Sequence, residues 1–123
     1  MRALVAVGSV WGILFVVPFI IYGSSSVLFG LKPPAGPAWR FLLSVAITKA
    51  GTAVAFVALF SLCREGWRGH WLLYAGIWFL MFAVSEIGDF VKTGYGFAEA
   101  MLGVLSEAIY APLSAFTVDR LFR

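Results

Sequence analysis

The chain has few charged residues, which make up 12% of its 123 residues. Soluble domains carry about 25% charged and about 45–50% apolar residues, whereas 62% of this chain is hydrophobic and its mean hydropathy is +0.96. A soluble domain of this length has too little interior to bury so much apolar surface. The composition therefore excludes an ordinary soluble domain and predicts a membrane protein.

The chain also lacks the residues that most metal and cofactor sites need. Its single cysteine, Cys63, and single histidine, His70, exclude an internal disulfide, bis-histidine haem ligation and a Cys/His zinc site. It contains no glycine-rich phosphate loop, no dinucleotide fingerprint and no nucleophile–histidine pair. We therefore expect no metal centre, and nothing selects a pigment, a quinone or another cofactor. An enzyme is the least favoured class.

Four apolar runs are long enough to cross a bilayer, which takes about 20 residues each. They are separated by a proline-rich stretch at 32–37, a polar stretch at 63–70 and a glycine-containing stretch at 92–96. The sequence thus predicts one all-α domain over 1–123, with four transmembrane helices in an up-down bundle and short loops. We expect the spans at about 3–28, 41–62, 71–91 and 97–118, with 119–123 as a short tail.

Basic residues at the ends of these spans predict the orientation. In a four-span chain the N-terminus, the middle loop and the C-terminus share one side, and that side carries five arginines against three basic residues on the other. The positive-inside rule then places both termini in the cytoplasm, with the protein in the cell (inner) membrane. The net charge of +3 is attributed to this topology rather than to nucleic-acid binding, because no run of five basic residues occurs.

Five ionisable residues interrupt the apolar runs, and four of them are candidate site residues, namely Lys49, Glu86, Asp89 and Glu107. The fifth, Glu99, is shallow enough to reach headgroups or water. At about 1.5 Å of rise per residue, Lys49 lies about 12 Å below the outer boundary, Glu86 about 7–8 Å and Glu107 about 15 Å. Asp89 is expected near the outer surface, only about 3 Å deep. We therefore predict a cluster centred on Lys49, because a charge at depth is costly unless it meets a partner or water.

Helical periodicity predicts which faces turn inward. On the fourth span one stripe of small and polar residues should be the buried side, and it comprises Glu99, Gly103, Ser106, Glu107, Tyr110 and Ser114. On the second span Thr48 and Thr52 share a polar face, with Lys49 on its flank. Thr48, Thr52, Ser106 and Tyr110 are thus predicted to support the charged cluster. Gly8 and Gly12 form a GxxxG pattern that predicts a helix contact, either within the chain or between copies.

Two functions remain open at this point. A lysine between two carboxylates can keep one charged and leave the other able to take up a proton or a cation, which favours a small proton- or cation-linked transporter or channel working as a homo-oligomer. Alternatively, the charges only neutralise one another and the chain is a non-catalytic accessory or assembly subunit of a larger membrane complex. Under either hypothesis the partners are the lipid bilayer and other membrane chains, with no nucleic acid.

Overall fold

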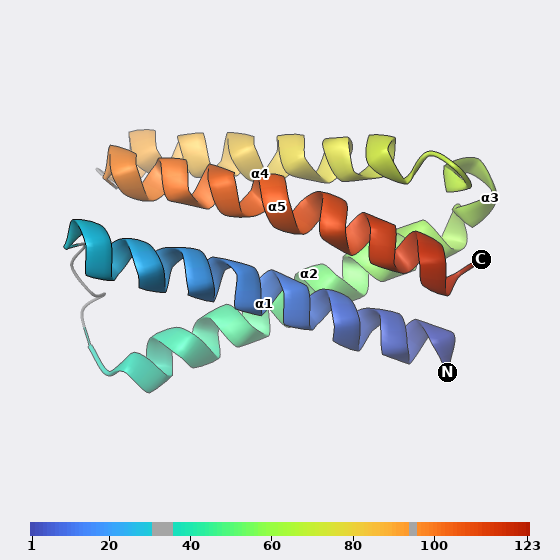
Figure 1. Ribbon diagram of the computed structural model, residues 1–123, viewed down its shortest axis with the longest axis horizontal. Helices are drawn as coiled ribbons and strands as arrows, with labels where there is room; N and C mark the ends of the chain where they lie inside the picture. The colour runs from blue at the N-terminus through green and yellow to red at the C-terminus, as the bar shows by residue number, and fades with distance from the viewer. Residues whose placement is uncertain (31–35, 94–95) are drawn as a thin grey trace.

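In the computed structural model the described residues form four long helices and one short helix (Figure 1). The structure describes residues 1–30, 36–93 and 96–123, and these ranges contain no strand. The predicted all-α fold is confirmed. The helices are α1 (Arg2–Phe29), α2 (Ala38–Leu62), α3 (Arg64–Trp67), α4 (Trp71–Thr93) and α5 (Phe97–Leu121).

The long helices have the length and apolarity of membrane spans. Within the described residues four segments meet both criteria, at Arg2–Leu28, Ala38–Leu62, Trp71–Lys92 and Phe97–Leu121. Large apolar side chains cover their outer faces, as at Leu4, which is 74% exposed. Such faces are stable against lipid and not against water, so this is an all-α fold of the multi-pass membrane type.

Glycine and proline set several helix ends. Helix α1 ends at Gly30, whose φ of 64° is left-handed and whose N–H donates to the Ser26 carbonyl at 3.0 Å. Helix α2 begins after Pro37, which has the φ of −65° that its ring imposes. Gly69, with φ of 77°, turns the chain from α3 into α4. Residues 31–35 of the predicted proline-rich loop lie outside the described residues.

The long helices pack in the order α4, α5, α1, α2, so that α5 and α1 are central (Figure 1). Helix α2 leans on α1 near its middle, where the Trp11 indole N–H donates to the Ala46 carbonyl at 3.0 Å. Its C-terminal half then reaches α4, since the Tyr74 hydroxyl donates to the Phe56 carbonyl and their rings lie 4.9 Å apart. The N-terminal half of α2 is mostly exposed.

Both termini and α3 lie at one end of the bundle (Figure 1), as the four-span topology predicts. Two details of the sequence prediction were wrong at this end. The polar stretch after Leu62 contains the short helix α3. Residues 119–121, predicted as part of a tail, continue α5, and Asp119 is only 3% exposed. The tail prediction failed because Arg123, one helical turn further on, pairs with the Asp119 carboxylate at 2.8 Å and compensates its burial.

Candidate functional site

Lys49 on α2 points toward α5 and α4. Its ammonium donates to the Tyr110 hydroxyl, with 3.3 Å between Nζ and Oη. The same nitrogen lies 4.8 Å from the centroid of the Tyr110 ring and 5.9 Å from that of Phe82 on α4. Cation–π attraction is strongest where water is excluded, so two aromatic faces and one hydroxyl hold this ammonium between three helices.

Glu86 on α4 lies directly against the backbone of α5. A Cβ added at Gly103 would be 2.5 Å from the Glu86 carboxyl carbon and 2.6 and 2.8 Å from its two oxygens. Real Cβ atoms do not make contacts that short, so the carboxyl group occupies space that only a glycine leaves open. The Glu86 carboxyl group is therefore packed directly against Gly103.

Glu107 lies one helical turn beyond Gly103 on the same face of α5 and is only 4% exposed. It interacts electrostatically with both Glu86 and Lys49. Within the described residues, its Oε2 atom is buried and has no hydrogen-bond partner. The structure thus brings Lys49, Glu86, Glu107 and Tyr110 together, and these four residues are called the charged cluster below.

The remaining predicted polar residues do not all join the charged cluster. Asp89 is exposed on α4. Thr48 is exposed and Thr52 is half-buried, and their hydroxyls donate to carbonyls of their own helix at 2.9 and 3.1 Å. Ser106 is buried, and its hydroxyl donates to the Leu102 carbonyl at 2.9 Å. These three hydroxyl groups therefore find their acceptors in the backbone of their own helices.

Gly8 and Gly12 lie away from the packed face of α1. A Cβ added at either glycine would meet nothing within 4 Å, whereas Ala6, Val10 and Leu14 on the same helix are 0% exposed. The two glycines thus form no close helix contact with the part of the chain that the structure describes. A contact between copies stays a prediction.

The buried face predicted on the fourth span is confirmed on α5 from Gly103 onward, whereas Glu99, its first predicted member, is only half-buried. Ser106, Glu107, Tyr110 and Ser114 are each at most 4% exposed. From Glu107 to Ser114 these buried polar side chains follow α5 for about 10 Å toward the end that holds both termini. Asp119 is also buried, but it lies about 120–180° around the helix from these side chains. We call Glu107, Tyr110 and Ser114 the α5 polar line.

Sequence reasoning missed three residues of this region. Gly103 was recognised as part of a stripe, but its contact with the Glu86 carboxyl group was not predicted. Phe82 precedes Glu86 by one helical turn, and this spacing could have placed its ring on the same face. The burial of Asp119 was not predicted, because the fourth span was predicted to end at residue 118.

No three histidine, cysteine or acidic side chains of the described ranges lie together as a metal ion would require. Comparison with family models, with curated proteins and with solved structures gives no match. The charged cluster and the fold therefore carry the functional argument.

Proposed function

We propose that the protein is a proton-linked transporter or channel of the cell membrane, working as a homo-oligomer with both termini in the cytoplasm. The observation that carries the proposal is the burial of Glu107, 4% exposed, beside Glu86 and Lys49 in the middle of four membrane-length helices. Ionisable side chains at such depth are expensive, and they mark ion and proton pathways in membrane proteins.

The charge count of the cluster gives it a reason to bind a proton. Two carboxylates and one ammonium leave one negative charge in excess, and an uncompensated charge in a low dielectric is strongly unfavourable. One proton shared by Glu86 and Glu107 removes that excess. The Tyr110 hydroxyl accepts a hydrogen bond from the Lys49 ammonium. In this proposal that bond is kept, and the two states differ by one proton on the carboxyl pair.

The surroundings of the cluster support transport rather than neutralisation alone. The α5 polar line leads from Glu107 to Ser114, toward the end that carries both termini, and Ser114 Oγ is buried and unpartnered among the described residues. These side chains offer hydrogen-bonding groups on part of the way from the cluster to one membrane surface. The C-terminal half of α2 contacts α4, whereas its N-terminal half is mostly exposed, so helices of a second copy would be needed to enclose a path there.

Proteoliposomes with a trapped pH indicator test this proposal. A pH gradient should drive proton flux through the wild-type chain, and Glu107→Gln and Glu86→Gln should each abolish most of it. Glu99→Gln, an acid two turns away on the same helix, is the matched control and should retain flux. Flux that survives in the Glu107→Gln/Glu86→Gln double variant contradicts the proposal. If a metal cation crosses the membrane and protons do not, the transported ion is the metal cation and not the proton.

The accessory-subunit alternative also has an observation in its favour. The N-terminal half of α2 exposes Phe41, Leu43 and Ile47 by 48%, 52% and 64%, and another membrane chain could pack there as well as lipid can. Purification in mild detergent separates the alternatives. A discrete homo-oligomer favours transport, whereas stoichiometric co-purification of other chains favours the subunit.

A further inference from the structure

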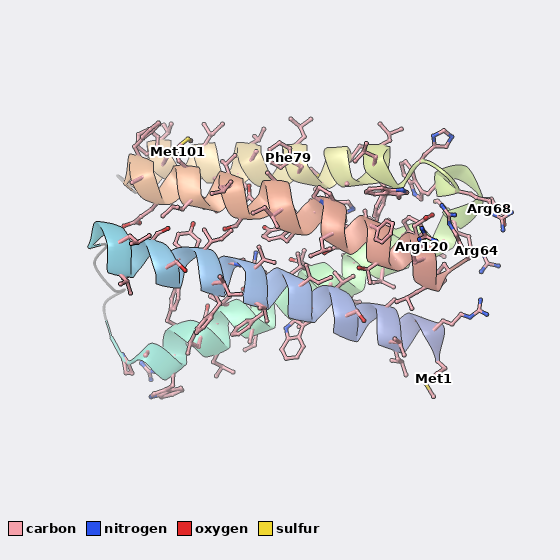
Figure 2. The ribbon with its side chains drawn as sticks, viewed as in Figure 1. Met1, Arg64, Arg68, Phe79, Met101 and Arg120 are labelled. Atoms are coloured by element: carbon pink, nitrogen blue, oxygen red, sulfur yellow. The ribbon has the colours of Figure 1, made fainter. Side chains whose placement is uncertain are left out.

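A second site lies at the end of the bundle where both termini and α3 meet. A cavity of about 220 Å³ opens there, and four arginines line it. Arg2 comes from α1, Arg64 from α3, Arg68 from the turn before α4, and Arg123 from the end of the chain. Figure 2 shows Arg64 and Arg68 at this end. Three separate segments of the chain, namely the start of α1, the connection between α2 and α4, and residue 123, thus bring four guanidinium groups to one cavity.

The positive charges in this cavity outnumber the negative ones. Its acidic residues are Asp119 and Glu65. Both the Nε and the Nη2 atoms of Arg123 contact one oxygen of Asp119, at 2.9 and 2.8 Å, so these two side chains neutralise each other. The exposed Arg2, Arg64 and Arg68 then face a single exposed carboxylate. Convergent like charges raise the free energy of the site unless an anion binds between them.

The geometry of guanidinium groups selects the kind of anion. Their planar N–H forks match the oxygens of a phosphate group, which they bind in a bidentate manner. The surface of the cavity is mostly polar, because Phe60, one of the two phenylalanines at its edge, is only 2% exposed. A ligand that presents a phosphate group would satisfy the guanidinium groups of this cavity.

The level of the cavity in the bilayer points to the same ligand. Arg2 begins the first candidate span, Phe60 lies two residues before the end of the second, and Asp119 two before the end of the fourth. The hydrocarbon region gives way to lipid headgroups at such span ends. Basic pockets between transmembrane helices on the cytoplasmic side are known to hold anionic headgroups.

We propose that this arginine-lined cavity binds the phosphate group of an anionic phospholipid from the cytoplasmic leaflet. The shared chemistry is a phosphate group, which a soluble phosphate ion could also supply. The site is separate from the charged cluster and does not depend on proton transport.

Native mass spectrometry of the full chain in mild detergent tests the proposal. Titration with dioleoylphosphatidylglycerol should give a saturable adduct that dioleoylphosphatidylcholine does not give. Arg64→Gln/Arg68→Gln should weaken this binding about tenfold or more, since each surface arginine contributes about 1 kcal/mol to attraction of anionic lipid. Glu65→Gln, which removes the exposed acid, should tighten it. All three side chains are exposed, so the fold should tolerate these changes.

Arg40→Gln is the matched control, because Arg40 lies at the opposite end of α2 with its guanidinium 5.6 Å from the Trp39 ring. It should bind the anionic lipid as the wild type does. Equal binding of both lipids, or equal loss in the Arg40 and Arg64/Arg68 variants, overturns the proposal. If inorganic phosphate binds and the anionic lipid does not, the ligand is a soluble phosphate ion and the proposal of a phospholipid is wrong.

Discussion

The contact between Glu86 and Gly103 gives a sharp test of the site. Gly103→Ala adds a Cβ that would lie 2.5 Å from the Glu86 carboxyl carbon, whereas ordinary contacts begin at 3.4 Å. The carboxyl group must therefore retreat by about 0.9 Å from a closely packed position. The atoms that must move are the far end of a flexible side chain, so we expect local displacement of the carboxyl group and retention of the fold.

The effect of Gly103→Ala on the free energy of unfolding depends on the side chain at position 86. Overpacking costs about 1–3 kcal/mol, and the mobile carboxyl group places this contact near about 1 kcal/mol. Replacing a helical glycine by alanine stabilises the protein by about 1 kcal/mol, because alanine has the higher helix propensity. In the wild type the two terms nearly cancel. With Glu86→Ala already present the steric term vanishes, and Gly103→Ala should stabilise the protein by about 1 kcal/mol.

A double-mutant cycle in detergent, read as free energies of unfolding, measures this coupling. Glu86→Gln is the decisive background, because glutamine keeps the size of the side chain and loses its charge. Gly103→Ala should behave there as in the wild type. Gly76→Ala, where an added Cβ meets nothing within 4 Å, should have the same effect in all three backgrounds. Coupling below about 0.3 kcal/mol between Gly103→Ala and Glu86→Ala would refute the assigned contact.

Three further predictions concern helix contacts and use the same unfolding measurement. Tyr110→Phe removes the hydrogen bond to Lys49 and keeps the ring, so it should destabilise the protein by about 0.5–1.5 kcal/mol; an effect near zero, or one that persists when Lys49 is methionine, would contradict this bond. Tyr74→Phe removes the bond from α4 to the α2 backbone and should cost about 1 kcal/mol, which an unchanged stability would rule out. Leu14→Ala, at 0% exposure, should cost about 2 kcal/mol or more. The same change at Leu4, 74% exposed, should cost far less, and equal losses would show that α1 does not pack through Leu14.

The helices and the buried face of α5 could be predicted because both depend on local pattern. Apolar runs of span length, bounded by glycine and proline, specify where helices form. The 3.6-residue period places Glu107 and Tyr110 on one face, and the estimated depths put Lys49 at a level between Glu86 and Glu107.

The detailed contacts depend on relations between helices that one-dimensional patterns do not contain. The packing order decides that Lys49 meets the Tyr110 hydroxyl and that the Glu86 carboxyl lies on Gly103. Thr48 belongs to the predicted polar face, yet it is exposed because the N-terminal half of α2 leans away from the bundle. To predict that Asp119 is buried, one would have to know that it pairs with Arg123, which is five residues beyond the predicted end of the span.

The packing of α1 on α5 also has a consequence for biosynthesis. Helix α1 leaves the ribosome before α5, and it meets this neighbour only when α5 has been made. At about 5–20 residues per second, the intervening stretch of about 70 residues takes about 4–14 s to translate. During this interval the α1–α2 hairpin must persist in the membrane without its central contact. Membrane insertion and completion of the core are thus separate events, and a chain that ends before α5 would leave α1 and α4 without the helix that joins them.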